Sequence, residues 1–200
     1  MSVRVAVVYY SATGNVHQLA QAVAEGAASR NAEVRLRRAQ ELAPDTAIDA
    51  NPAWRSHVDA TKHEVPEATL DDLDWATAYA FGTPTRFGNV ASQLKQFIDR
   101  TGRQWQAGVF HNKPATSFTS AMNCHGGQES TLLSLNNVFY HWGCIIVPPG
   151  YTDPLLYAAG GNPYGTSWPS GGGEGPDEAT LAAARYQGRH LADIADRLRG

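Results

Sequence analysis

The sequence predicts an α/β protein built on a five-stranded parallel sheet with helices on both faces. Two observations support this fold class. Short apolar runs alternate with segments of helical periodicity along the chain, and the first apolar run leads directly into a helix. In doubly wound sheets of this kind, ligands bind beyond the carboxyl ends of the strands. The loops that follow the first, third and fourth predicted strands are therefore the candidate functional loops.

The first half of the chain supplies three strands and two helices. Residues 3–9 are apolar except for Arg4, which is typical of a buried parallel strand. Apolar residues then recur at helical spacing at Val16, Leu19 and Val23, so we expect a helix over 16–30. Strands follow over 33–38 and 76–81. Residues 90–100 form a helix with Leu94 and Phe97 on one face.

The second half continues the alternation. A strand is predicted over 115–120, and residues 129–142 form a helix with apolar positions such as Leu132, Leu135 and Phe139. A last strand over 144–147 and a closing helix over 176–198 complete the pattern. Two long segments, 39–75 and 149–176, carry few periodic apolar residues and are interpreted as insertions into a single domain that spans residues 1–200.

Composition narrows the class of protein. A chain of 200 residues with 42% hydrophobic residues can form one two-faced core. The formal net charge is only −3, and no basic run interleaved with aromatics indicates nucleic-acid binding. Cys124 and Cys144 lack the spacing of a disulfide framework. No apolar run reaches about 18 residues and no leader pattern precedes the first strand, so we expect a cytoplasmic protein without membrane insertion.

The turn after the first strand, residues 9–15, has the composition of a phosphate site. It brings together the free amides and the positive dipole end of a helix, and Ser11, Thr13 and Asn15 add short polar side chains. A nucleotide-hydrolysing Walker loop would require a lysine, which this turn lacks. The turn therefore favours a phosphate monoester that is bound and kept. An ordinary strand-to-helix turn with Ser/Thr capping is the alternative.

The other two loops suggest a flat ligand. Residues 82–89 place Arg86 and Phe87 on a turn that contains proline and closes with glycine. Residues 120–128 contain paired glycines, which let backbone amides approach a ligand, together with the side-chain donors of Asn123 and His125. A phosphate cradle, an aromatic platform and a donor-rich turn at one edge of a sheet predict a site for a flat heterocycle with a phosphate tail.

At this point the chain resembles a known family. Ser11-Ala12-Thr13-Gly14 resembles the flavodoxin-type phosphate loop. Four further stretches, 82–89, 125–129, 141–151 and 184–188, are similar to the tryptophan-repressor-binding (WrbA-like) NAD(P)H:quinone oxidoreductases. The most specific stretch is Gly-Thr-Pro-Thr-Arg-Phe-Gly-Asn at 82–89. The resemblance implies a flavodoxin-like sheet of order 2-1-3-4-5, FMN as cofactor, NADH or NADPH as co-substrate, a quinone substrate and a homotetramer.

The resemblance also implies which residues contact FMN. His141 matches a family histidine at the flavin, and Trp105 matches a tryptophan placed over a neighbouring subunit's flavin. Together with Phe87 they are the candidate catalytic residues. The cofactor-binding set comprises the phosphate loop, the loop on the isoalloxazine and the loop at its ribityl and pyrimidine side, namely Ser11, Ala12, Thr13, Gly14, Asn15, Val16, Pro84, Thr85, Arg86, Phe87, Gly88, Ser120, Ala121, Met122, Asn123, Cys124, His125, Gly126, Gly127 and His141.

The chain departs from the family pattern at two places. Thr13 stands where some members have a tyrosine, and the turn over 121–127 is about one residue longer, with Cys124 and His125 replacing small residues. An adjacent Cys and His could suggest a metal pair, but they lack the spacing of a metal site, and no metal is expected.

Each singled-out side chain has a structural alternative. His141 could complement a helix dipole, Trp105 could anchor an interface, Arg86 could form a surface ion pair, and Phe87 could belong to the core.

The predicted function is two-electron hydride transfer from NAD(P)H through FMN to a quinone, with both substrates using one open face in turn. The alternative is a flavodoxin-type one-electron carrier. Such carriers dock through a charged rim, and the three ligand loops carry only Arg86 and Glu129. A non-enzymatic repressor-binding protein is a third reading, for which no recognition helix is visible. The residues do not identify the physiological quinone or the preferred nicotinamide.

Overall fold

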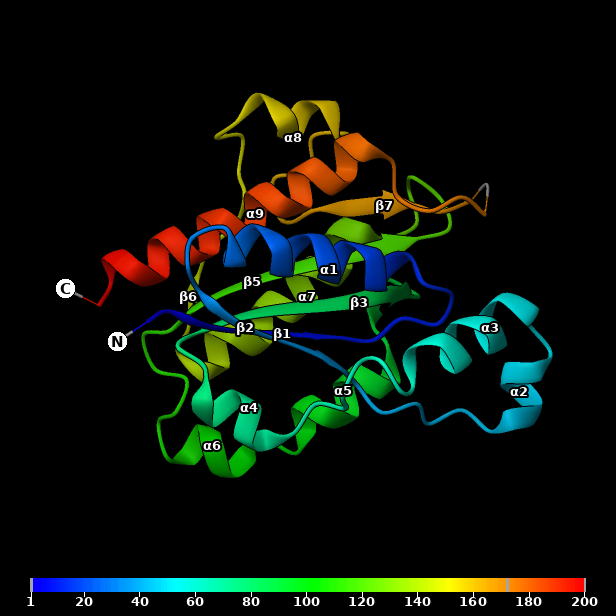
Figure 1. Cartoon of the computed structure of the whole chain (residues 1–200), viewed down its shortest axis with the longest axis horizontal. Coiled ribbons are helices and arrows are strands. Elements are labelled where there is room, and N and C mark those ends of the chain that lie inside the picture. Colours follow the sequence, from blue (N-terminus) through cyan, green and yellow to red (C-terminus); the bar gives the residue numbers. More distant parts are fainter. Residues whose placement is uncertain (1, 172, 200) are drawn as a thin grey trace.

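In the computed structural model, which describes residues 2–171 and 173–199, one parallel sheet forms the centre (Figure 1). Its main path runs β2 (Glu33–Arg38), β1 (Arg4–Tyr9), β3 (Ala78–Arg86), β5 (Pro114–Ala121) and β6 (Ile145–Ile146). The five predicted strands therefore lie in the predicted order, which confirms the flavodoxin-like fold class. Two short strands lie off this path: β4 (Asn89–Val90) is antiparallel to β3, and β7 (Ser167–Pro169) is parallel to β5.

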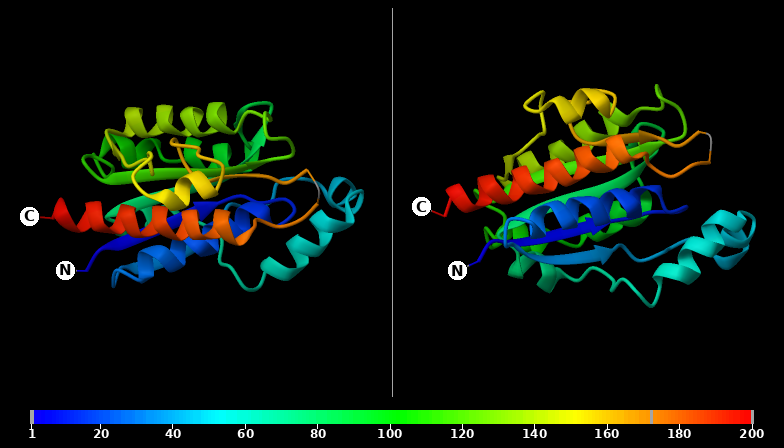
Figure 2. Two further views of the ribbon diagram at one scale, coloured as in Figure 1. Left: turned by 90° about the horizontal axis from the view of Figure 1, so that it is seen from above. Right: turned by 45° about the horizontal axis from the view of Figure 1, so that its top comes forward.

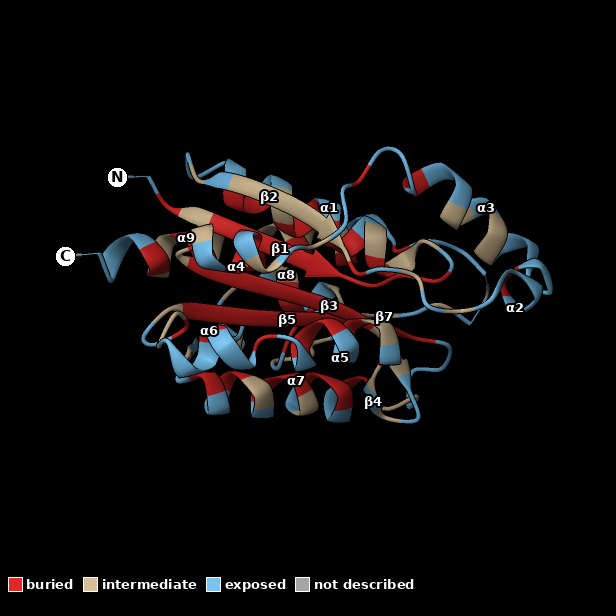
Figure 3. Cartoon of the chain, turned by 90° about the horizontal axis from the view of Figure 1, so that it is seen from below, coloured by how far each residue is buried: buried red, intermediate tan, exposed pale blue. Residues whose placement is uncertain are grey.

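Helices cover both faces of the sheet. α1 (Asn15–Ala28) and α9 (Glu178–Arg197) pack side by side on one face, where they bury Val5, Val7 and Tyr9 of β1 (Figure 2). The other face carries α4 (Leu70–Trp75), α5 (Ser92–Asp99), α6 (Gly102–Gln106) and α7 (Gln128–Trp142). Residues Ala6 and Val8 of β1 point to this second core. Successive side chains of a strand point to opposite faces of the sheet, and helices cover both faces. β1, β3 and β5 are therefore buried along nearly their whole length (Figure 3).

The two insertions contain more regular structure than the sequence indicated. Residues 39–75 form α2 (Asp45–Asp49) and α3 (Pro52–Thr61) before α4, and residues 149–176 form α8 (Pro154–Ala158) and β7. These elements are short and begin at local caps. For example, Asn51 Oδ1 accepts hydrogen bonds from the amides of Ala53 and Trp54. α2 and α8 have five residues each, which are too few for helical periodicity to be recognised in the sequence.

The expected loop over 82–89 is partly wrong, because β3 does not end at residue 81 but continues to Arg86. Thr83 and Pro84 still pair with Thr119 and Ser120 of β5. β3 therefore runs straight on to the ligand edge of the sheet, and only residues 87 and 88 turn back into β4.

The edge position beside β5 is shared by two segments. β6 pairs with Pro114 and Ala115, and β7 pairs with residues 119–121. The side-chain amide of Gln187 on α9 fills the gap between them. Its Nε2 donates to Ser117 O at 2.8 Å and to Thr116 Oγ1 at 2.7 Å, while its Oε1 accepts from Thr166 N at 2.8 Å.

The α2–α3 hairpin, residues 45–61, projects beyond the carboxyl ends of the strands (Figure 1). The loops after β1, β3 and β5 end at this same edge. Among the described residues, none of the helices has the length and apolar character needed to cross a membrane.

Candidate active site

The loop between β1 and α1 has the geometry of an anion site. The Oγ of buried Ser11 accepts a hydrogen bond from Gly14 N at 3.1 Å, and Gly14 has a φ of 101°, which an L-residue adopts only with strain. No described residue accepts a hydrogen bond from the amides of Asn15, Val16 or His17 at the start of α1. These free donors, with the positive end of the helix, can hold a phosphate.

A cavity of about 320 Å³ opens at this loop. It is large enough for a small-molecule ligand. Its walls combine the three predicted loops with residues that were not predicted. The lining residues are Ser11, Ala12, Thr13, Asn15, Val16, Asn51, Trp54, Pro84, Thr85, Arg86, Ser120, Ala121, Met122 and Ser170. Of these, Arg86 alone carries a charge. The cavity therefore offers an anion amides, hydroxyls and one guanidinium.

Phe87 is the most unusual side chain at this edge. It is 103% exposed and has a φ of 52°, in the left-handed region that bulky residues avoid. The structure thus excludes the alternative that Phe87 belongs to the protomer's core. It stands beside the cavity rather than among its lining residues. A strained and fully exposed aromatic residue at a loop tip points to a functional position.

The loops after β3 and β5 are tied together. Thr131 Oγ1 on α7 donates to Thr85 Oγ1 at 3.1 Å, and Ser130 Oγ donates to Gly88 O at 3.0 Å. A Cβ added at Gly127 would lie 2.9 Å from the Gly88 Cα, so the two glycine turns are in direct contact. The relative position of Phe87 and the glycine turn is therefore fixed by α7.

The loop after β5 divides between two cavities. Ser120, Ala121 and Met122 line the phosphate-loop cavity, and Met122 is 72% exposed. Cys124 instead lines a second cavity of about 350 Å³ with residues of the 149–176 segment. The predicted residues Asn123, His125, Gly126 and Gly127 line neither of these two cavities.

Trp105 and His141 lie together on a different face, formed by α5, α6 and α7. Trp105 Nε1 donates to His141 O at 2.8 Å, and both residues line a shallow cavity of about 480 Å³. Trp105 is 52% exposed. Within one protomer these two residues do not line the phosphate-loop cavity.

Three lining residues were missed by the sequence analysis: Asn51, Trp54 and Ser170. A signal for the first two existed. Asn51-Pro52 is a helix start, and the residues that follow on the inner face of α3 recur at helical spacing as Trp54, His57, Val58 and Thr61. Ser170 follows β7, a strand too short to predict.

Burial governs the titration of the histidines behind the phosphate loop. Burial lowers the pKa of His57 to about 4, and repulsion from the Arg38 guanidinium and from the His17 ring, when that ring is protonated, lowers it further. Burial also lowers the pKa of His17, whose Nδ1 lies 2.5 Å from the Tyr9 hydroxyl. Both rings are therefore neutral at pH 7, and a phosphate site does not gain charge from them.

The chain is similar to known flavoproteins and quinone reductases. Residues 3–152 match the family described as NADPH-dependent FMN reductase. A relative from Deinococcus radiodurans, named NAD(P)H dehydrogenase (quinone), is 43% identical over 198 residues, which cover 99% of this chain and 98% of the relative. A relative of the same name from Geobacter sulfurreducens is 43% identical over 209 residues, covering 98% of this chain and 99% of the relative.

Solved structures show the same fold. A structure described as the flavodoxin, WrbA-like protein from Agrobacterium tumefaciens has a TM-score of 0.66 at 25% identity and covers 98% of this chain and 99% of its own. A flavodoxin from the domain Archaea has a TM-score of 0.65 at 17% identity, covers 97% of this chain and 99% of its own, and shares the fold.

Proposed function

Since this chain belongs to the NADPH-dependent FMN reductase family, we propose that it is an FMN-dependent NAD(P)H:quinone oxidoreductase. The observation that carries the proposal is the single cavity at which the loops after β1, β3 and β5 meet, with a lysine-free phosphate loop at one end. Full-length relatives named NAD(P)H dehydrogenase (quinone) support the assignment of both substrates. We also propose that the reaction takes place in the cytoplasm, where NAD(P)H is available.

The residues present fit FMN. Free amides at the start of α1 and the hydroxyls of Ser11 and Thr13 suit a terminal phosphate monoester. The neighbouring walls are mainly apolar, as a flat ring requires, and include the hydroxyls of Thr85 and Ser120, which suit a ribityl chain. Arg86 is the one charge that lines the cavity and can balance the negative charge of a reduced flavin or of the phosphate.

When bound, FMN supplies hydride acceptance from a nicotinamide and hydride donation to a quinone. The chain's own residues bind and orient the reactants. Phe87, exposed and fixed beside the glycine turn, offers a flat apolar wall. The Gly126 amide already donates to Asn123 O at 2.9 Å, so the Gly127 amide is the candidate donor to the flavin's pyrimidine side. We propose that NAD(P)H and quinone occupy the same open face in turn, which requires ping-pong kinetics.

Anaerobic mixing tests the activity. The yellow holoprotein is mixed with NADH and then with benzoquinone. Prompt bleaching by NADH followed by prompt recolouring by the quinone is the expected result. If NADH does not bleach the holoprotein, the mixing is repeated with NADPH, and a holoprotein that neither nucleotide bleaches favours the one-electron carrier instead.

We also propose a homotetramer in which Trp105 and His141 act at a neighbouring protomer's flavin. The exposure of Trp105, its hydrogen bond to His141 O and the shallow cavity beside them support a surface that meets another copy. Trp105→Ala is expected to keep FMN content and protomer folding nearly intact while quinone turnover falls, because a wall that positions the acceptor is lost. Sedimentation with parallel activity measurements checks this, and a fully active monomer contradicts it.

A further inference from the structure

The α2–α3 hairpin places an aromatic side chain at the phosphate end of the cofactor cavity. Trp54 lines this cavity together with the phosphate loop. One helical turn further along α3, His57 is so close to the loop that its Nδ1 would lie 3.6 Å from a Cβ added at Gly14. The rings of His57 and His17 on α1 have centroids 5.4 Å apart. α3 therefore packs against the phosphate loop and carries Trp54 with it.

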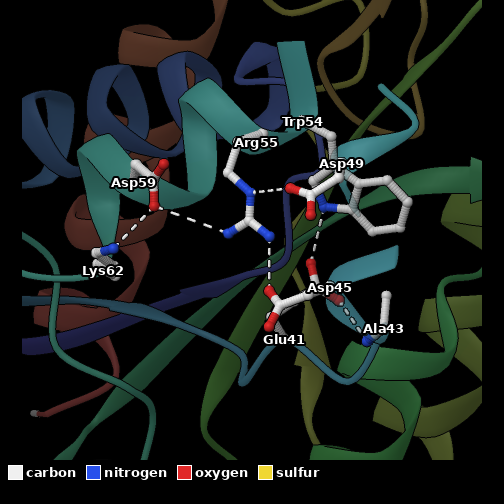
Figure 4. A network of polar contacts seen from close by, with 8 residues as sticks. All are labelled: Glu41, Ala43, Asp45, Asp49, Trp54, Arg55, Asp59 and Lys62. Carbon is white, nitrogen blue, oxygen red and sulfur yellow. Dashed lines mark hydrogen bonds and ion pairs between the residues drawn. The ribbon is translucent and has the colours of Figure 1, made fainter. Parts of the chain in front are cut away.

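One carboxylate fixes the orientation of Trp54. Trp54 Nε1 donates to Glu41 Oε2 at 2.9 Å (Figure 4). The same carboxylate accepts hydrogen bonds from Tyr10 Oη at 2.9 Å and from Gln93 Nε2 at 2.9 Å. Tyr10 precedes the phosphate loop, and Gln93 lies in the first turn of α5, which follows the loop over 82–89. Glu41 thus joins the indole to both ligand loops.

The Glu41 side chain must be ionised to do this. Burial opposes its ionisation, but hydrogen bonds from Ala43, Gln93, Trp54 and Tyr10 together hold the pKa of the carboxyl below its ordinary value. All of these groups donate, so the site requires an acceptor at each carboxylate oxygen. A glutamine would turn an amide group toward at least one donor and release it.

The hairpin itself is held as a unit by Arg55. Its guanidinium lies 2.6 Å from a carboxylate oxygen of Asp45 and 2.6 Å from one of Asp49, and 3.8 Å from one of Asp59 (Figure 4). These contacts connect α2 with α3. The indole is therefore presented by a braced helix pair rather than by a single loop.

We propose that Trp54, positioned by Glu41, retains the cofactor by covering the phosphate and ribityl end of bound FMN. This inference rests on the proposed function. The phosphate loop has no lysine, so it holds its anion through amide and hydroxyl hydrogen bonds, which strengthen when water is excluded. A flat apolar ring whose own N–H is already satisfied by Glu41 excludes water without introducing an unpaired polar group.

The rate of FMN release tests the proposal without measuring turnover. Release is followed as the recovery of flavin fluorescence after the holoprotein is diluted. Trp54→Ala is expected to release FMN about tenfold faster or more, since lost contacts act mainly on dissociation. Trp54→Phe keeps a ring but loses the N–H, and we expect a smaller increase. Riboflavin, which lacks the phosphate, should lose less affinity than FMN in Trp54→Ala.

The positioning role of Glu41 needs its own variants. Glu41→Gln should speed FMN release as Trp54→Ala does. The double variant should release FMN no faster than Trp54→Ala alone, because both changes remove the indole from the same covering position. Trp75→Ala is the matched control. It deletes the same side chain from α4, where the indole lies 4.1 Å from the Arg35 guanidinium and outside the cavity, and release should not change.

The outcomes separate the two proposals. A wild-type apoprotein that does not bind FMN overturns the proposed function. Wild-type binding with unchanged release from Trp54→Phe, Trp54→Ala and Glu41→Gln overturns only the retaining role. Faster release from Trp75→Ala also overturns the retaining role, and so does a loss of riboflavin affinity in Trp54→Ala that equals the loss of FMN affinity. If the increases in release rate caused by Glu41→Gln and Trp54→Ala multiply in the double variant, the positioning role of Glu41 is overturned.

Discussion

Two phenylalanines six residues apart should respond to the same substitution in opposite ways. Phe81 is fully buried in β3, with its ring centroid 5.8 Å from that of Phe139 and 5.6 Å from that of Trp142. Phe87 is 103% exposed. Phe87→Ala therefore removes no packing from the protomer, whereas Phe81→Ala opens a cavity in the core.

The magnitudes follow from burial. Phe81→Ala is expected to lower the free energy of unfolding by about 3–5 kcal/mol, or the melting temperature by about 6–20 °C at 2–4 °C per kcal/mol. Phe87→Ala should stay within about 0.5 kcal/mol of wild type. The free energy of unfolding of Phe87→Gly should equal or exceed that of wild type. The left-handed backbone costs an L-residue about 1–2 kcal/mol, which outweighs glycine's entropy cost of about 0.5–1 kcal/mol.

For FMN affinity and quinone turnover, we expect Phe87→Ala to have the larger effect of the two variants. An aromatic contact contributes about 0.5–1.5 kcal/mol beyond its buried area, so Phe87→Ala should reduce FMN affinity or quinone turnover about 2- to 12-fold. Urea unfolding of the apoprotein at two protein concentrations, FMN titration and steady-state turnover are the measurements. The reasoning is refuted if Phe87→Ala unfolds as easily as Phe81→Ala at both concentrations, or if FMN affinity and turnover are both unchanged.

Three further outcomes are expected. Ser11→Ala and Thr13→Val should each weaken FMN binding, and the pair should cost several kcal/mol, because a buried hydrogen bond to a charged group contributes about 1.5–3 kcal/mol; unchanged affinity of the double variant in an FMN titration would remove this turn as the phosphate site. Gly82→Ala should lower the melting temperature, because the new Cβ would lie 2.1 Å from the Phe118 ring; a normal melting curve would contradict the packing described. Stability should also fall as the pH drops from about 6.5 toward the His57 pKa of about 4, since the unfolded chain then binds the proton that the folded chain excludes; urea titrations across this range should show a smaller loss in His57→Gln.

Sequence reasoning succeeded where one local pattern is sufficient. The apolar residues that follow Arg4 in β1 and the helical spacing of Val16, Leu19 and Val23 each have a single interpretation, so the loop between them was located directly. Five of the predicted cofactor-binding residues in this loop line the cavity, and six more, which the family resemblance implied, line it from the segments at the ends of β3 and β5. Their contact with FMN stays a prediction.

It failed where tertiary contacts decide. Trp54 reaches the cavity only because Glu41, Tyr10 and Gln93, from three separate segments, meet at one carboxylate. Their separation along the chain gives no periodic signal. The extension of β3 through Pro84 likewise depends on pairing with β5, which the proline itself would argue against in isolation. The roles proposed for Trp105 and His141 concern a second copy of the chain, which no local pattern describes.

The amide of Gln187 has a consequence for how the molecule closes. A primary amide has the same donor and acceptor as a peptide group, so this side chain links Ser117 O of β5 to Thr166 N at the part of the β5 edge that pairs with neither β6 nor β7. α9 therefore takes part in the hydrogen bonding of the sheet edge through Gln187, in addition to packing on the sheet. A chain interrupted before residue 187 would leave Ser117 O and Thr166 N, which belong to two buried residues, without their partner. The last tenth of the polypeptide thus completes the sheet edge that continues through β7 to Ser170, which lines the cofactor cavity.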